Sequence, residues 1–344
     1  MAITKKAFGT TDGNRTVSLY HLENSNGAYV EILDYGARIR SIVVPDQNNT
    51  LTDVVLGLTD LNAYLNDDAS LGAVCGRVAN RIAKGHFSLN EKDYTLAINN
   101  GPNSLHGGPT GFGVRLFDGK IVDDDLILTY RSADMEEGFP GALTLTVTYH
   151  WSEDNELSIL YEAVSDADTI LNVTNHAYFN LNGHDSGDVL DHLLMVDSDA
   201  MTDFDDFQIP TGQISETAGT PFDFKEAKPI GRDIHGVHPQ MKGNTYDHNL
   251  ILNGSGFREA AILKSAASGI RMTCFTDQPG LQLYVYDYVL HNKGKGNIDY
   301  QPYGAVCLET QHYPDSINHP EFPSIVLKKG EKFRSNTVYN FSTI

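Results

Sequence analysis

Alternating apolar and polar positions run through most of the chain and predict β-strands with one buried face. Between Leu143 and Trp151 the odd-numbered positions are apolar, and the polar residues 152–155 then turn the chain into a similar run at 157–163. This pattern predicts a hairpin. Three more hairpins are predicted in the same way, from 87–89 to 94–96, from 120–122 to 126–128, and from 260–263 to 270–275.

Helical periodicity is scarce along the sequence. Residues 59–65 predict one short capped helix, and residues 230–234 predict a turn or two. Many short strands separated by Gly and Asn/Asp turns indicate an all-β fold, a large antiparallel β-sandwich. No repeat, low-complexity tract or linker interrupts the chain, so residues 1–344 are predicted to form a single domain.

The composition favours a neutral small ligand. The chain has 344 residues, 40% of them hydrophobic and 20% charged, which suits a globular protein with a large core. Its formal net charge of −20 predicts repulsion of nucleic acid, anionic membranes and phosphorylated compounds. The N-terminal lysines precede no apolar stretch and no run is long enough to span a membrane, so a cytoplasmic location is expected.

Several familiar catalytic and metal-binding patterns are missing from the sequence. The cysteines, Cys75, Cys274 and Cys307, form no CxxC pair, so neither a disulfide framework nor a structural zinc site is expected, and they are interpreted as small core residues. There is no H-E-x-x-H, no phosphate-binding loop and no G-x-S-x-G motif. Proton transfer without a metal, nucleotide or other cofactor is therefore the economical hypothesis.

Glu309 is the most informative candidate for such chemistry. It ends an apolar strand-like run, and the polar loop that follows is stiffened by Pro314 and Pro320. A fold presents a general base to a polar ligand in this way. By itself, the segment fits equally well a surface glutamate at the end of a strand.

Two upstream segments, 103–108 and 174–181, supply the histidines His106 and His176. In a strand, His176 would share a face with Tyr178, opposite apolar neighbours, and would point away from the core. Gln282 would likewise share a face with Tyr284 and the next alternate tyrosines. Aromatic, amide and imidazole groups on one face suit a sugar. The alternative is a solvated outer face.

Six segments in order resemble the signatures of the aldose 1-epimerase (galactose mutarotase) family, and the resemblance runs nearly end to end along the chain. They are 76–82, 103–108, 174–181, 246–249, 278–282 and 305–320. The resemblance implies the family's galactose mutarotase-like supersandwich fold. It also implies a cofactor-free isomerase that interconverts the α and β anomers of free hexoses such as D-galactose and D-glucose.

Ring opening of an aldose requires one base for the C1 hydroxyl and one acid for the ring oxygen. A carboxylate and an imidazole are suited to these tasks near neutral pH, so Glu309 is predicted as the base and His176 as the acid. The resemblance implies the same roles. It further implies a set of residues around the sugar, namely Asn80, Arg81, His106, Tyr178, Asp247 and Gln282.

Several of these residues also have a structural interpretation. His106 fits a loop histidine bonded to backbone, Asp247 fits a turn acid, and Arg77 fits a structural partner of a carboxylate. His248, His312 and His319 are interpreted as structural or as supports behind the site. The chain departs from the family pattern at Phe117 and at 286–288, which puts the sugar preference in doubt rather than the reaction.

Two alternative functions remain at this stage. A hexose-6-phosphate 1-epimerase would need a basic cluster, which the charge balance disfavours. A non-catalytic sugar-binding or sugar-sensing sandwich would have no need of a matched acid and base. The expected partner is a small-molecule monosaccharide, with no nucleic acid and no membrane, for a monomer or homodimer.

Overall fold

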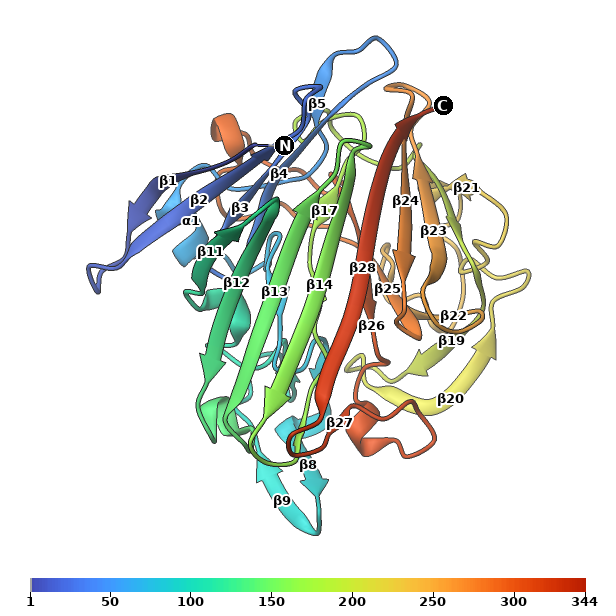
Figure 1. Ribbon diagram of the computed structural model, residues 1–344. Coiled ribbons are helices and arrows are strands. Elements are labelled where there is room, and N and C mark those ends of the chain that lie inside the picture. Colours follow the sequence, from blue (N-terminus) through green and yellow to red (C-terminus); the bar gives the residue numbers. More distant parts are fainter. Residues whose placement is uncertain (1) are drawn as a thin grey trace.

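Three antiparallel sheets carry most of the chain in the computed structural model, which describes residues 2–344 (Figure 1). The largest sheet has nine strands and presents its outer face in Figure 1. Its strand order is β11 (Asp118–Val122), β12 (Asp125–Ser132), β13 (Leu143–Trp151), β14 (Glu156–Ser165), β28 (Lys332–Thr343), β24 (Ile270–Thr276), β23 (Arg258–Lys264), β18 (Leu193–Val196) and β21 (Lys228–Pro229).

The second sheet has six strands, and the third has five. The six strands run in the order β17 (Tyr178–Phe179), β26 (Val306–Gln311), β25 (Gly280–Val285), β22 (Asp247–Leu252), β19 (Ser198–Phe204) and β20 (Pro210–Glu216). The five are consecutive along the chain: β1 (Ala2–Thr10), β2 (Thr16–Glu23), β3 (Tyr29–Leu33), β4 (Arg38–Pro45) and β5 (Leu51–Asp53).

Short pairs of strands connect these sheets. They are β6 (Val74–Cys75) with β16 (Thr174–Asn175), β7 (Arg81–Ile82) with β10 (Ser104–Leu105), β8 (His86–Leu89) with β9 (Lys92–Thr95), and β15 (Thr169–Ile170) with β27 (Val326–Leu327). Helix is confined to α1 (Leu61–Leu65) and a few 3-10 turns, and none of the helices in the described residues is long and apolar enough to cross a membrane.

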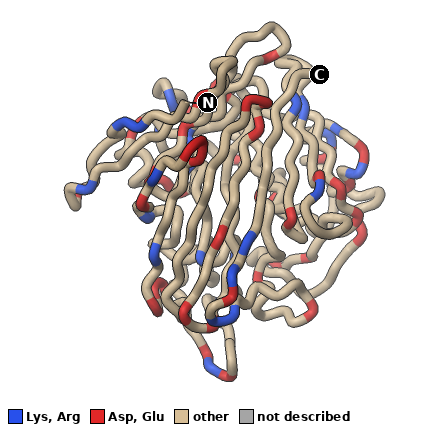
Figure 2. Tube along the Cα trace, viewed as in Figure 1, with Lys and Arg blue, Asp and Glu red and all other residues tan. Residues whose placement is uncertain are grey.

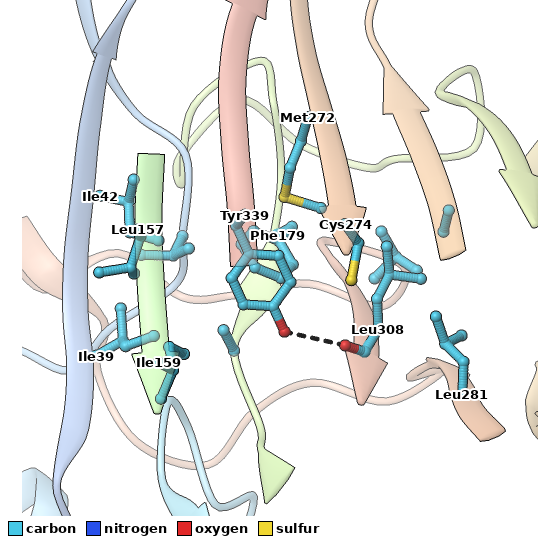
Figure 3. Packing of buried hydrophobic residues seen from close by; sticks show 14 of the residues in the cluster. Ile39, Ile42, Leu157, Ile159, Phe179, Met272, Cys274, Leu281, Leu308 and Tyr339 are labelled. Atoms are coloured by element: carbon cyan, nitrogen blue, oxygen red, sulfur yellow. Dashed lines mark hydrogen bonds between the residues drawn. The ribbon is translucent and has the colours of Figure 1, made fainter. Parts of the chain in front are cut away.

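The main core lies between the nine-stranded sheet and the other two large sheets (Figure 3). Side chains of β14 lie beside those of β4, side chains of β24 and β28 lie near those of β17 and β26, and the hydroxyl of Tyr339 donates to the carbonyl oxygen of Leu308 at 3.1 Å. The only tryptophan, Trp151, is fully buried and donates its indole N–H to the carbonyl of Ala28 at 3.0 Å. Apolar burial of this extent is the main stabilising term of the sandwich.

The polar residues of the alternating strands face outward. Buried and half-exposed positions alternate along the whole of β13, as the sequence pattern predicts for a strand with one wet face. Figure 2 shows acidic and basic residues along the strands of the large sheet and in many of its turns. All four predicted hairpins are confirmed by antiparallel pairing.

Two local predictions are confirmed, and three need correction. The 59–65 segment contains α1, whose N-cap Asp60 accepts from the Ala63 amide at 2.9 Å, and 230–234 contains a 3-10 turn. The 171–181 segment, however, is not a continuous strand: it pairs only as β16 and β17, with His176 between them. Asp247, predicted to lie outside regular strand structure, begins β22. Arg77 is structural, but its guanidinium binds backbone carbonyls and hydroxyls rather than a carboxylate.

Candidate active site

The pairing register of three central strands places polar side chains in rows on one face of the six-stranded sheet. Glu309 of β26 is opposite Gln282 of β25, and Cys307 is opposite Tyr284, which is in turn opposite Asp247 of β22. Because successive side chains of a strand alternate between faces, these residues share a face, while Leu281 and Leu308 point into the core (Figure 3).

An open cleft of about 620 Å³ lies over this face. Several short loops complete its wall, so residues far apart in the sequence meet there. The lining residues are Asp68, Ala69, Ser70, Asn80, Arg81, Asn100, Leu105, His106, His176, Tyr178, Asp247, Tyr284, Tyr288 and Glu309. Of the eight residues singled out from the sequence, seven line this cleft, and Gln282 lies behind it.

Glu309 and His176 meet at the cleft surface. Oε1 of Glu309 lies 3.6 Å from Nε2 of His176, and both side chains are almost fully buried. The other carboxylate oxygen, Oε2, has no hydrogen-bond partner within residues 2–344. An unpartnered buried acceptor is costly in an empty protein and is available to a ligand.

The backbone and neighbouring rings hold His176 in place. Its amide donates to the carbonyl of Ala73 and its carbonyl accepts from the amide of Gly72, both at 2.9 Å. Its ring stacks on Tyr178 with a centroid distance of 5.0 Å, and Sγ of Cys307 lies 3.6 Å from Nδ1. The hydroxyl of Tyr178 donates to the carbonyl of Ala69 at 2.7 Å, so that ring is anchored too.

Burial moves the acid–base pair toward its uncharged form. It raises the pKa of the Glu309 carboxyl well above its ordinary value, and the negative charge of Asp247 adds to the effect. Burial also lowers the pKa of His176 to about 4. Taking either ion out of water is unfavourable, whereas the carboxylic acid and the neutral imidazole are less affected. Burial therefore shifts the pair away from the two ions and toward the carboxylic acid and the neutral imidazole.

His106 lies beside this pair with a defined tautomer. Its ring meets that of His176 edge to face at 5.4 Å, and its Nδ1 accepts a hydrogen bond from the backbone amide of Asn80 at 3.2 Å. Burial, together with the proximity of His176 and Arg81, keeps the pKa of His106 well below its ordinary value. The ring is neutral with its proton on Nε2, and it is a hydrogen-bond donor to a ligand oxygen.

Asp247 and Arg81 form a charged wall of the cleft, 3.7 Å apart. Gln282 donates to Oδ1 of Asp247 at 2.6 Å, and this bond orients the carboxylate from outside the set of residues that line the cleft. Arg81 donates from Nε to Asn100 at 2.9 Å. Held in this way, the carboxylate and the guanidinium present an acceptor and a donor to vicinal hydroxyls.

Gln208 is the residue that the sequence analysis missed. It donates to Oδ2 of Asp247 at 2.7 Å and accepts from Arg81 at 2.6 Å. Gln208 therefore bridges these two side chains without itself lining the cleft. It lies in the turn between β19 and β20 with a positive φ of 59°. No sequence motif surrounds Gln208, and its contacts are with residues that are distant in the sequence. Cys307 was assigned to the core, and it is buried, but it also contacts the His176 ring.

The three other histidines named in the sequence analysis have structural contacts. His248 accepts from the amide of Asp247 at 2.9 Å and bonds the carbonyl of Gln240 at 2.8 Å. His312 bonds the side chain of Gln278, and His319 contacts Glu321. These contacts agree with the structural interpretation of the three residues. They lie outside the cleft lining.

Comparison with known proteins gives one consistent result. A family model described as aldose 1-epimerase matches residues 18–340. A galactose mutarotase of Bos taurus is 39% identical over 99% of both chains, and an aldose 1-epimerase of Escherichia coli (strain K12) is 36% identical over 94% of both. The crystal structure of an aldose epimerase homologue from C. elegans matches with a TM-score of 0.88 and 31% identity, over 95% of this chain and 99% of that one.

Proposed function

Because the chain belongs to the aldose 1-epimerase family of isomerases, we propose that it interconverts the α and β anomers of free hexoses such as D-galactose and D-glucose. Glu309 acts as the base on the C1 hydroxyl, and His176 acts as the acid on the ring oxygen. The observation that carries the proposal is the 3.6 Å contact between these two side chains at the surface of a polar cleft.

The reaction moves protons only within this pair and the sugar. Glu309 takes the proton of the C1 hydroxyl while His176 protonates O5, so the C1–O5 bond breaks and C1 becomes an aldehyde. Rotation about C1–C2 exposes the other face of the carbonyl. Ring closure then reverses both transfers: the O5 hydroxyl attacks C1, His176 takes the O5 proton, and Glu309 returns one to the C1 oxygen. No atom is gained or lost.

The cycle uses two states of the pair with the same proton count. The carboxylate–imidazolium state starts ring opening, and the carboxylic acid–imidazole state accompanies the open aldehyde. Burial favours the second state in the empty cleft. A bound sugar brings hydroxyl groups against Oε2 of Glu309 and Nε2 of His176. These contacts reduce the difference in free energy between the two states. Matched acid and base strengths are the condition for efficient proton transfer.

The charges of the cleft support a neutral sugar over a phosphorylated one. Arg81 is the one arginine or lysine among the residues that line the described cleft, and it already contacts Asp247. Asp68, Asp247 and Glu309 supply carboxyl groups to the same lining. A phosphate would lack an uncommitted cation there and would be repelled by the carboxylates.

Polarimetry of freshly dissolved α-D-galactose, α-D-glucose and glucose 6-phosphate tests the proposal. We expect the wild type to accelerate mutarotation of the two free hexoses, and Glu309→Gln and His176→Asn each to lower kcat by about 10²–10⁴-fold. Glu216→Gln, on the exposed edge strand β20, is the matched control. A wild-type rate equal to that of buffer would refute the enzymatic function. Full activity in both variants would refute the assigned roles.

A further inference from the structure

The thiol of Cys307 lies against the ring of His176, although the proposed reaction does not use it. Cys307 precedes Glu309 by two residues in β26, so both side chains lie on the cleft face of the sheet. Its neighbours on the adjacent strands are Tyr178 of β17 and Tyr284 of β25. The side chain is fully buried, and Sγ lies 3.6 Å from Nδ1 of His176. The sulfur is therefore held at one particular nitrogen of the ring.

The two ring nitrogens of His176 have different partners. Nε2 lies 3.6 Å from Oε1 of Glu309, and Sγ of Cys307 is the one side-chain hydrogen-bond partner of Nδ1 within residues 2–344. In a neutral imidazole, the partner of one nitrogen decides which nitrogen carries the proton. Burial favours a carboxylic acid at Glu309, so Nε2 faces a proton donor and is the acceptor. The ring proton is then on Nδ1, facing the sulfur.

A neutral thiol suits this position because it is a weak hydrogen-bond acceptor. Burial, with a contribution from the charge of Glu309, raises the pKa of the Cys307 thiol well above its ordinary value, so the sulfur is uncharged. A thiolate or a carboxylate at Nδ1 would stabilise the imidazolium and make His176 a poor acid. A neutral sulfur orients the N–H group with much less stabilisation of the imidazolium.

We propose that Cys307 is a positioning residue that keeps a proton on Nδ1 of His176 and so reserves Nε2 for proton exchange with the sugar ring oxygen. The catalytic consequence rests on the proposed function. In ring opening, Nε2 gives its proton to O5 while Nδ1 keeps its own. In ring closure, the bare Nε2 takes the O5 proton back. In the other tautomer, Nε2 would already carry a proton and could not accept a second one.

The other groups around His176 do not duplicate this contact. The titratable and charged groups that face its ring or act on it are Glu309, His106, Tyr178, Tyr284, Asp247, Asp67 and Arg38. The hydroxyl of Tyr178 donates to the carbonyl of Ala69, and that of Tyr284 donates to the hydroxyl of Tyr288 at 3.4 Å. Within residues 2–344, none of these side chains forms a hydrogen bond with Nδ1. Substitution of Cys307 therefore tests the sulfur alone.

Nitrogen NMR of the wild type, with isotope-labelled histidine, locates the ring proton without any assay of activity. The correlations between ring carbon-bound protons and ring nitrogens distinguish the two neutral tautomers and the imidazolium, and the His176→Asn spectrum identifies the signals of His176. We expect the neutral ring to carry its proton on Nδ1. His106 is the internal reference for the opposite tautomer, because its Nδ1 accepts from the amide of Asn80. A His176 ring protonated on Nε2 would overturn the inference.

Polarimetry of α-D-galactose with Cys307→Ala tests the catalytic consequence. We expect kcat to fall about 2–10-fold, the effect of losing one neutral hydrogen bond, with KM within about twofold of the wild type. The acidic limb of the kcat–pH profile should move to lower pH, because the imidazolium loses its acceptor at Nδ1. Cys274→Ala is the matched control: Cys274 of β24 is equally buried but forms no side-chain hydrogen bond within residues 2–344.

A purely structural role of Cys307 predicts a different result. Both alanine variants would then lose stability in urea titrations while keeping the wild-type kcat and pH profile, and this outcome would also overturn the inference. If the wild type does not accelerate mutarotation at all, the proposed function fails, and the NMR measurement judges the position of the His176 proton by itself. The same measurement on the wild type decides the matter if Cys307→Ala does not fold.

Discussion

Replacing Gln208 with leucine tests whether the charged wall of the cleft depends on a residue that does not itself line it. Gln208 bonds Asp247 Oδ2 at 2.7 Å and Arg81 at 2.6 Å. Leucine has a similar size but neither donor nor acceptor. Both residues bear the same backbone cost at the positive φ of position 208, because neither is glycine or asparagine. The change therefore isolates the amide group.

The expected magnitude follows from these contacts. A hydrogen bond to a charged group contributes about 1.5–3 kcal/mol, and each 1.4 kcal/mol is a factor of ten in an equilibrium constant. Asp247 keeps its bond from Gln282, so only part of its orientation is lost. We predict that Gln208→Leu raises KM for galactose about 10–100-fold. The kcat should change by less than about threefold, since Glu309 and His176 are untouched.

The assay is initial-rate polarimetry with α-D-galactose, together with a urea denaturation curve for each protein. Gln213→Leu, on the neighbouring strand β20 with an exposed side chain, is the control for a general effect of the substitution. An unchanged KM in a stably folded Gln208→Leu protein would refute the supporting role. A fall in KM would show instead that Gln208 competes with the sugar for Asp247 and Arg81.

Three further predictions concern stability and reactivity. Arg77 donates to the carbonyls of Pro140 and Gly141 and to Ser132 in a buried setting, so Arg77→Met should lower the free energy of unfolding by about 3 kcal/mol in urea titrations; a loss near zero contradicts this. Burial lowers the pKa of His248 to about 4 from 6.5, so the unfolded chain binds more protons than the folded chain between these pH values. The contribution of the buried neutral His248 to the free energy of unfolding is therefore complete above pH 6.5 and is lost as the pH falls toward 4. His248→Gln should therefore weaken the acid dependence of the free energy of unfolding, and an identical pH profile would contradict the assignment. Burial raises the pKa of Cys75 and Cys307 well above the ordinary value and that of Cys274 to about 12, so a thiol-specific reagent at pH 7 should label the native protein slowly and all three thiols after denaturation.

Local alternation made the hairpins predictable, because period-2 patterning and turn residues are both short-range properties. The residues of the 143–163 segment alone were sufficient to predict its hairpin. The interruption at His176 was not visible, since 171–181 alternates as a strand would. There the chain pairs first with β6 and then with β26, and this change of partner is a tertiary event. Likewise, Asp247 begins a strand because β25 provides the partner for the 247–251 register.

The candidate site shows the same division between local and tertiary information. The family signatures contain seven residues that line the cleft, but they did not reveal that Gln282 bonds Asp247. Gln208 has no sequence signal, because the contact that gives it a role spans 127 residues to Arg81 and 39 to Asp247. A residue whose function arises from long-range contacts to functional groups is not marked by its neighbours in sequence.

Strand register is the physical link between this fold and its chemistry. Glu309, Gln282 and Asn249 form one row across β26, β25 and β22, and Cys307, Tyr284 and Asp247 form the adjacent row. A slip of one residue in β26 would turn Glu309 into the core and bring Leu308 to the cleft. The same apolar packing that stabilises the sandwich, including that around Leu308 and Tyr339, therefore fixes the orientation of the face that carries the proposed catalytic pair (Figure 3). Opposite faces of the same strands thus carry the core and the proposed active site, so we expect a core substitution that shifts β26 to reduce activity before the protein unfolds.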